Sequence, residues 1–198
     1  KEQEMSSRNK ILEAVKLNQP ALQQLPDLNT LVAVKYANAF SQFVTVLNGI
    51  GGTVIEIQNT HEINEYVRKN FSSNQNYVTT LPELSEIKML DGNLDAHFLE
   101  NIEVAVVKAI FGVAENGAVW LKEEEMKIRA LPFICQHLTV VLHKKDIVNN
   151  MHEAYSFIDD SKYGFGVFIA GPSKTADIEQ SLVLGAHGPK TMTVFVLS

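Results

Sequence analysis

Apolar side chains along this chain gather in short runs that polar residues barely interrupt. Six of these runs are rich in β-branched or aromatic residues and predict strands: 53–57, 77–80, 118–121, 138–142, 165–170 and 192–197. A further apolar stretch, 102–113, is interrupted at Lys108. Strands that are apolar at nearly every position predict a sheet buried on both faces, as parallel sheets usually are.

Helical spacing dominates the segments before and between these runs. Near the amino terminus, Ile11, Leu12 and Val15, with Leu17 beyond them, follow Ser6-Ser7, which can cap a helix. Four further helices are predicted downstream: from residue 29 or 30 to 47, 61–70, 146–155 and 175–184. The alternation of helices and strands predicts an α/β fold with a mostly parallel sheet flanked by helices.

Length and composition indicate how this fold is organised. The chain has 198 residues, of which 45% are apolar and 20% charged. These values predict one α/β domain over residues 1–198, with a helical amino-terminal region over about residues 1–50. The best candidate for a linker, 83–95, holds one glycine, no proline and several apolar residues, so we expect it to lie within the domain.

Charge and hydropathy exclude two classes of partner. Seventeen Lys and Arg residues against 23 Asp and Glu residues give a formal charge of −6, which does not suit the clustered basic surface of a nucleic-acid-binding protein. No run approaches the roughly 18 apolar residues of a membrane-spanning helix. The first residues, Lys1 to Met5, lack the apolar core of a signal peptide. We therefore expect a cytoplasmic location.

The residues that bind metals and clusters are sparse. Cys135 is the single cysteine and follows the apolar stretch 131–134, which predicts a buried, inert thiol. One thiol cannot hold an iron–sulfur cluster, which usually needs four, and the histidines lack the spacing of a zinc site. We expect Glu123-Glu124-Glu125 to be a solvated face, and no cofactor or metal on this chain.

The strongest local motif, Gly-Pro-Ser-Lys-Thr-Ala-Asp-Ile-Glu at 171–179, joins a predicted strand to a predicted helix. Its serine or threonine can cap that helix, and the free N–H groups of a helix amino terminus attract anions. Candidate ligands for a carboxylate or phosphate are therefore Gly171, Ser173, Lys174 and Thr175, in a loop of the kind that faces the ligand cleft of α/β sheets. A capped helix without a ligand explains the same pattern. The motif is not a Walker A loop, because its lysine follows serine rather than glycine.

Two other segments offer candidate site residues. Glu115 precedes Asn116-Gly117, a strong hairpin-turn signal, and could act as a nucleophile or general base at the end of a strand. His187 lies between Gly185, which suits a helix C-cap, and Gly188-Pro189, which predicts a turn. It is a tentative ligand residue, and a histidine satisfied within its loop explains it as well.

Together these segments resemble the lactate utilization protein C family, whose domain is the LUD domain. Three stretches carry the resemblance: Ala114-Glu115-Asn116-Gly117, where the family has threonine for Asn116; the motif 171–179; and its continuation through Leu182-Val183-Leu184-Gly185 to His187-Gly188-Pro189. Arg129, Leu131-Pro132 and His137 also resemble the family, with a longer spacing between the proline and the histidine. The resemblance covers about residues 109–197, and Ile110 stands where members often carry an acidic residue.

The resemblance implies a fold similar to that of CoA transferases and sugar-phosphate isomerases. It also implies an accessory role in the oxidation of L-lactate to pyruvate, with two iron–sulfur partner proteins that carry the clusters. A homo-oligomer is compatible with the sequence. We further expect a small anionic ligand at Gly171, Ser173, Lys174 and Thr175, with His187 nearby.

Two other functions stay open. Glu115-Asn116-Gly117 resembles the Glu-Asn-Gly motif of some CoA transferases, in which the glutamate attacks an acyl-CoA. An acyl-transfer enzyme with Glu115 as its nucleophile is therefore one alternative, and a regulatory protein that senses a ligand is the other. Whether the chain is an enzyme on its own is left open, because similarity of fold does not carry the chemistry with it.

Overall fold

The protein is described from a computed structural model of the whole chain. The structure describes five stretches of it: 6–27, 32–71, 76–158, 164–175 and 183–198. The chain divides into two units, residues 1–32 and residues 33–198. Within the described stretches, no helix is both long and apolar enough to cross a membrane.

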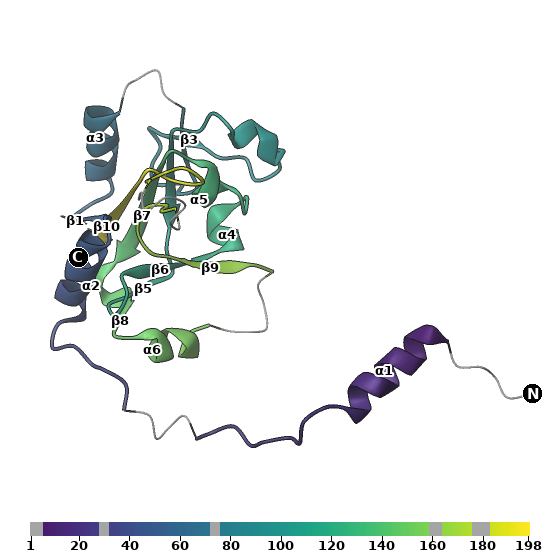
Figure 1. Cartoon of the computed structure of the whole chain (residues 1–198). Helices are drawn as coiled ribbons and strands as arrows, with labels where there is room; N and C mark the ends of the chain where they lie inside the picture. Colours follow the sequence, from purple (N-terminus) through teal and green to yellow (C-terminus); the bar gives the residue numbers. More distant parts are fainter. Residues whose placement is uncertain (1–5, 28–31, 72–75, 159–163, 176–182) are drawn as a thin grey trace, which may run out of the picture. The chain divides into compact units, whose positions relative to one another are not determined.

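The helices and strands follow one another in the order that Figure 1 colours along the chain. The helices are α1 Ser7–Leu17, α2 Ala39–Gly49, α3 His61–Asn70, η2 Ala96–Leu99, α4 Glu123–Met126, α5 Leu131–Ile134, η3 Lys144–Asp146 and α6 Met151–Ser156, of which η2 and η3 are 3₁₀ helices. The strands are β1 Thr53–Ile57, β2 Tyr77–Thr79, β3 Lys88–Met89, β4 Val104–Lys108, β5 Phe111–Val113, β6 Ala118–Lys122, β7 His137–His143, β8 Ile147–Val148, β9 Gly166–Ile169 and β10 Thr191–Leu197.

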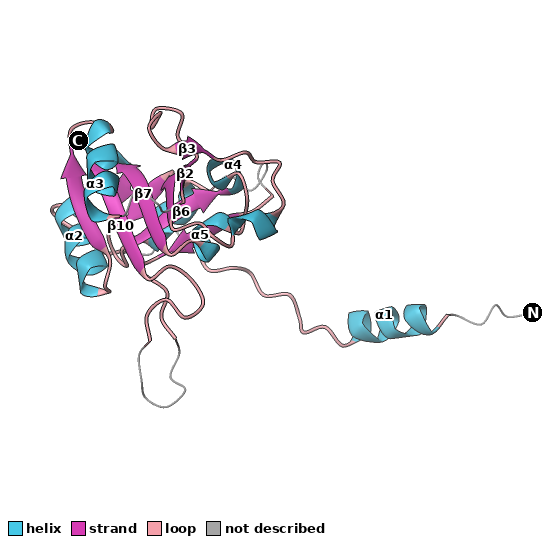
Figure 2. Ribbon diagram, turned by 90° about the horizontal axis from the view of Figure 1, so that it is seen from above, coloured by secondary structure: helices cyan, strands magenta, loops and turns pink. Residues whose placement is uncertain are grey.

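Six strands form one large sheet in the order β1-β10-β7-β4-β2-β3, and Figure 2 shows its central strands side by side. Every pairing in this sheet is parallel. Side chains alternate between its faces, so in β4 Val104 and Val106 enter one core while Ala105 and Val107 enter the other. The predicted mostly parallel sheet, buried on both faces and flanked by helices, is confirmed.

Different elements cover the two faces of the large sheet. On one face lie α3, through Ile63 and Val67, and the loop after β2, through Leu84. On the other face lie α2, through Phe43, and β6, through Leu121, together with α4 and α5. The segment 83–95 contains buried residues and packs within the unit of residues 33–198.

A second sheet, with the strand order β8-β5-β6-β9, was not foreseen in the sequence. Its strands β5 and β6 pair antiparallel through the turn 114–117, where the Gly117 N–H donates to the Val113 carbonyl oxygen at 2.9 Å. A turn of four residues permits only an antiparallel pair, because a parallel pair needs a long crossover. The Asn116-Gly117 turn is therefore confirmed, while the expectation of parallel pairing fails for β5–β6 and β6–β9 and holds for β5–β8.

The helix predicted from residue 29 or 30 to 47 begins only at Ala39. The Asn38 side chain caps α2 by accepting the backbone N–H of Ser41 at 3.0 Å. Upstream, the Tyr36 N–H donates to the Asn149 side chain at 2.9 Å, which fixes the preceding chain outside a helix. Long-range side-chain contacts thus shorten a helix that apolar spacing alone would extend.

The helix predicted over 146–155 also begins late, at Met151. Asn150 caps α6 by accepting the Glu153 N–H at 2.9 Å, and its amide group donates to the Val34 carbonyl oxygen at 2.8 Å. The residues before it form η3 and β8, and β8 pairs with β5. One buried asparagine therefore fixes both the start of α6 and the course of the chain at Val34.

The unit of residues 1–32 contains α1 as its described helix. The Ser6 side chain accepts the Asn9 N–H at 3.4 Å, in agreement with the predicted cap, and no residue of α1 is buried. Within the predicted helical region, 1–50, the structure therefore places α1 in one unit and α2 in the other. The α/β unit itself begins at Ala33.

Candidate functional site at the amino edge of the large sheet

The predicted ligand segment, 171–175, lies where the strands of the large sheet begin, which we call the amino edge. Gly171 has a φ of +74°, and a Cβ atom added to it would lie 3.1 Å from the Ile50 carbonyl oxygen. Ile50 stands between α2 and the first residue of β1. The segment does follow the carboxyl end of β9, but β9 belongs to the small sheet. The partial negative charge at the carboxyl end of α2 disfavours an anion beside Gly171.

The helix predicted over 175–184 is wrong at both of its described ends. Lys174 and Leu184 form an antiparallel bridge. The Thr175 N–H donates to the Val183 carbonyl oxygen at 3.1 Å, and the Val183 N–H donates to the Thr175 hydroxyl at 3.1 Å. These contacts join the two ends as paired extended segments. Asp177 and Glu179 lie outside the described residues.

This pairing reduces the number of backbone N–H groups that could bind an anion. The Ser173 N–H donates to the Pro189 carbonyl oxygen at 2.9 Å, and the Thr175 N–H is taken by Val183. Two of the backbone groups expected to bind an anion therefore have partners already. Side chains remain as ligands, namely the half-buried Ser173 hydroxyl and the exposed Lys174 ammonium group.

The predicted segment around His187 contacts the 171–175 segment at Gly188. A Cβ atom added to Gly188 would lie 3.2 Å from the Ser173 hydroxyl oxygen. The missing side chain thus leaves space beside that hydroxyl, and the exposed His187 is the neighbouring residue. The structure therefore brings Ser173 next to the loop that carries His187. The Lys190 N–H then donates to the Gln136 carbonyl oxygen at 2.7 Å, which leads the chain into β10.

A polar cluster that the sequence did not reveal lies at the same edge, and we call it the His137 cluster: His137, Thr191 and Glu103. His137 and Thr191 open the neighbouring strands β7 and β10 and are in register. The His137 Nδ1 atom lies 2.7 Å from the Thr191 hydroxyl, and Nε2 lies 3.5 Å from a Glu103 carboxylate oxygen. The imidazole ring also contacts the Phe71 ring, with 4.8 Å between their centroids. His137 was singled out only by resemblance, since its partner Thr191 is 54 positions away along the chain.

Burial and neighbouring charges shift the pKa values of His137 and of Tyr77 beside the cluster. Burial lowers the pKa of His137, the Glu103 carboxylate opposes that shift, and the Lys190 ammonium group adds to it. Burial also raises the pKa of Tyr77, with the Glu103 charge as a second cause. A neutral imidazole held between a hydroxyl and a carboxylate can accept a proton and pass it on.

Comparison with known proteins identifies the family. The sequence model of the LUD domain family matches residues 87–197, more than half of the chain. The chain belongs to the LUD domain family. The match includes both predicted ligand segments and the His137 cluster.

Several curated relatives of this LUD domain share the name Lactate utilization protein C. Lactate utilization protein C of Bacillus pumilus (strain SAFR-032) is 35% identical over 109 residues, which are 49% of this chain and 45% of that protein. The protein of the same name from Geobacillus sp. (strain WCH70) is 31% identical over 113 residues, 54% of this chain and 47% of that protein. The chain thus spans about half the length of the curated relatives it matches.

A solved structure agrees with the fold of this LUD domain. The crystal structure of a DUF162 family protein from Deinococcus radiodurans covers 84% of this chain and 100% of its own, with a TM-score of 0.62. The sequence identity is 15%, so this likeness speaks for the fold alone.

Glu115 of the LUD domain, the candidate nucleophile, has a structural partner. Its carboxylate accepts the Met151 N–H at 2.8 Å, and its own N–H donates to the Asn149 carbonyl oxygen at 3.0 Å. These contacts tie the hairpin turn to the first residue of α6, where a carboxylate is favourable. The exposed carboxylate therefore serves as a cap of α6 in this structure.

Two further expectations about charged and thiol groups are settled. Cys135 is fully buried, and burial raises the pKa of its thiol to about 12, so it stays protonated and inert. Glu123 is not simply solvated, because its carboxylate binds Arg129 through two nitrogens, at 2.6 and 3.0 Å. Among the described residues, no group of three or more His, Cys, Asp or Glu residues could hold a metal ion.

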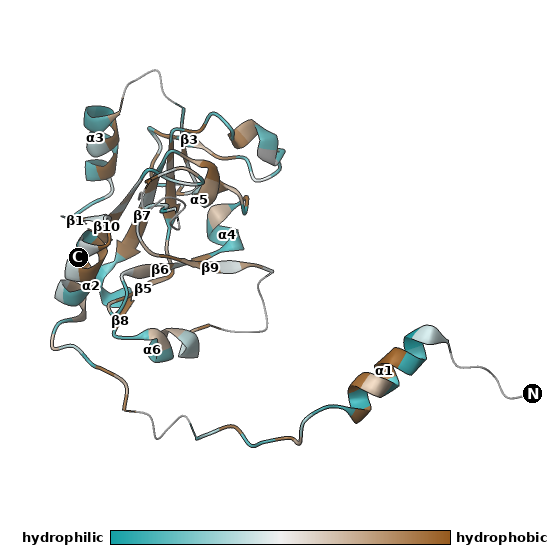
Figure 3. Ribbon diagram, in the orientation of Figure 1, coloured by the Kyte–Doolittle hydropathy of each residue, from teal (hydrophilic) through white to brown (hydrophobic). Residues whose placement is uncertain are grey.

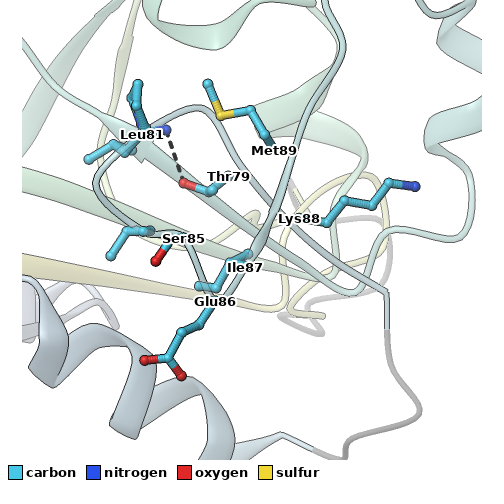
Figure 4. Close-up of a pocket in the computed structure, with 9 residues that line it drawn as sticks. Thr79, Leu81, Ser85, Glu86, Ile87, Lys88 and Met89 are labelled. Carbon is cyan, nitrogen blue, oxygen red and sulfur yellow. Dashed lines mark hydrogen bonds between the residues drawn. The ribbon is translucent and has the colours of Figure 1, made fainter.

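A cavity of about 550 Å³ lies at the opposite, carboxyl edge of the sheet, after β2 (Figure 4). Its Thr79 hydroxyl donates to the Val106 carbonyl oxygen and accepts the Leu81 N–H, at 3.2 and 3.0 Å. The Glu86 carboxylate turns toward α3, where it pairs with Arg68 at 2.6 Å. The Thr79 hydroxyl and the Glu86 carboxylate are therefore already engaged within the fold.

Proposed function

We propose that this LUD domain serves lactate oxidation as an accessory subunit of an iron–sulfur system. The match to relatives named Lactate utilization protein C carries this proposal, and the LUD domain model covers both predicted ligand segments. Oxidation of L-lactate to pyruvate releases two electrons and two protons. Two iron–sulfur partner proteins would accept the electrons, since the one thiol of this chain is buried and protonated.

A small anion is the proposed ligand of the amino edge. The loop shaped by Gly171 and Thr175 presents the Ser173 hydroxyl and the Lys174 ammonium group, with His187 on the adjoining segment. A carboxylate such as that of lactate suits a cation and a hydroxyl donor. The engaged backbone N–H groups make the side chains, rather than a helix amino terminus, the basis of this proposal.

The partner proposal is tested by purifying the tagged full chain from lactate-grown source cells without oxygen. We expect two cysteine-rich iron–sulfur proteins to co-purify, and lactate-dependent dye reduction by the purified assembly to fall when the chain is depleted. Recovery of the chain alone, under conditions that preserve the clusters, would contradict the proposal.

The ligand proposal is tested by titrating L-lactate and inorganic phosphate into the purified chain by calorimetry. The double variant Ser173→Ala with Lys174→Ala should weaken binding at least tenfold. Lys69→Ala, which removes an exposed lysine of α3, is the matched control and should bind as the unaltered chain does. Equal affinity in the double variant and the control would overturn the proposal.

A further inference from the structure

Helix α1 carries an apolar stripe without a buried partner. Ile11, Leu12 and Val15 are 63%, 51% and 56% exposed, and Figure 3 shows apolar and polar residues interleaved along the helix. At 100° per residue these three side chains share one face, whereas Leu17 lies on the opposite face. Helices of fewer than about 12–15 residues are marginal in water, so this helix of 11 residues needs a partner surface.

Cations border the apolar stripe. Arg8 lies one turn before Ile11 on the same face, and Lys16 follows Leu12 by one turn, while Glu13 points away from the stripe. The stripe is therefore suited to an apolar surface with an acidic rim.

A surface of that kind lies within the unit of residues 33–198. A cavity of about 390 Å³ lies beside β3 and η2, at the edge of the large sheet. Its apolar lining includes Val78, Met89, Leu94, Phe98, Leu99 and Ile102. Phe98 is 70% exposed and Met89 is 44% exposed, which is unusual for large apolar side chains that lie together.

The groove has acidic residues along its rim. Asp91 lines it beside one lining cation, Lys88, while Asp95, which pairs with His97, and Glu100 flank η2. All three acidic residues are exposed. This charge is opposite to that beside the α1 stripe. The apolar lining of the groove suits the apolar stripe of α1, and the acidic residues beside it suit the cations of α1.

We propose that α1 of one copy of this chain docks in this groove of a second copy, so that two copies exchange their amino-terminal helices. An amphipathic helix in an apolar groove is a common recognition mode. Exchange makes the contact twice, once in each direction, as a two-fold dimer requires. The inference does not depend on the proposed role in lactate oxidation.

The path of the chain favours a second copy over the same chain. The arm leaves the α/β unit at Val34, which Asn150 holds at the start of α6. The groove lies by β3, at the opposite edge of the sheet from β1, and Figure 1 shows α6 and β3 on different sides of the unit.

Sedimentation of the full chain tests the exchange. We expect a dimer of about twice 22.0 kDa, and Val15→Asp should shift it to the monomer mass. Leu17→Asp introduces the same charge on the opposite face of α1 and should leave the dimer intact. Phe98→Asp should also give monomers, whereas Phe157→Asp, at a phenylalanine that is 65% exposed outside the groove, should not. A dimer that survives Val15→Asp and Phe98→Asp would overturn the inference.

Disulfide trapping identifies the occupant of the groove. Chains carrying Leu12→Cys and chains carrying Phe98→Cys, mixed and oxidised, should give a covalent dimer. The same mixture with Leu17→Cys in place of Leu12→Cys should not, and the buried Cys135 does not compete. Trapping only within a single chain that carries both cysteines would overturn the exchange in favour of its own helix. Trapping in neither arrangement would overturn the groove as the site of α1.

Discussion

Two glycines beside the carboxyl end of α2 adopt backbone conformations that other residues rarely do. Gly117, with a φ of +69°, adjoins Leu47, and Gly171, with a φ of +74°, adjoins Ile50. The pair Asn116-Gly117 predicts such a turn from the sequence, whereas the contact with α2 cannot be predicted, because α2 lies about 70 positions upstream. The sequence therefore identifies candidate residues for such turns but not the distant residues that they contact.

Gly117→Ala should destabilise the protein by at least about 1–2 kcal/mol, because alanine is strained at positive φ. Its Cβ would also lie 3.0 Å from the Leu47 backbone. The melting temperature should fall by about 2–4 °C per kcal/mol. Gly49→Ala, at a helical glycine with nothing within 4 Å, is the control and should not destabilise. Equal melting temperatures for the two variants would refute this account of the turn.

His137 makes stability depend on pH. Because burial lowers its pKa in the folded state below the ordinary 6.5, the unfolded chain takes up a proton first as the pH falls. The stability that His137 contributes is thus present above about pH 6.5 and is lost as the pH falls through the lowered pKa. His137→Gln should show a shallower loss of melting temperature between pH 7.5 and 5 than the unaltered chain. Thr191→Val removes the hydroxyl partner but not the titrating ring, so its slope should persist; identical slopes for all three proteins would contradict this account.

The elements predicted best are those whose boundaries local residues determine. Helix α3 at 61–70 and strand β1 at 53–57 have the predicted bounds. The predicted helices 29–47 and 146–155 start late because Asn38 and Asn150 form their caps. The side chains of Asn149 and Asn150 also bind the distant backbone of Tyr36 and Val34. The two described ends of the predicted helix 175–184 pair with each other, because the N–H groups of Ser173 and Thr175 donate to the carbonyl oxygens of Pro189 and Val183. Local pattern cannot anticipate such partners.

The Glu115 carboxylate, in the hairpin turn, caps helix α6. Glu115→Ala removes the acceptor of the Met151 N–H and should cost about 1 kcal/mol of stability, as the loss of a helix cap typically does. Glu115→Gln keeps an oxygen acceptor and should cost less. Denaturant unfolding of the two variants measures the difference. A covalent thioester trapped at Glu115 with hydroxylamine after acyl-CoA treatment would instead assign it a nucleophilic role.

At the scale of the whole molecule, the fold class and the family follow from the sequence, while the assembly of the site does not. Apolar runs predict the parallel sheet, and the 171–179 motif predicts where the family's signature lies. The contact of His137 with Thr191 depends on how strands β7 and β10 pair, and that of Ser173 with Gly188 on the hydrogen bond from Ser173 to Pro189. The relatives extend beyond the matched region, to about twice its length.

We propose that this LUD domain supports lactate oxidation while its iron–sulfur partners carry the electrons. The most direct measurement is lactate-dependent dye reduction in anaerobic extracts of source cells that lack the chain, before and after the purified protein is added back. We predict that activity falls without the chain and returns equally with the unaltered protein and with Cys135→Ala, because the buried thiol takes no part. Unchanged activity in the cells that lack the chain would contradict the account.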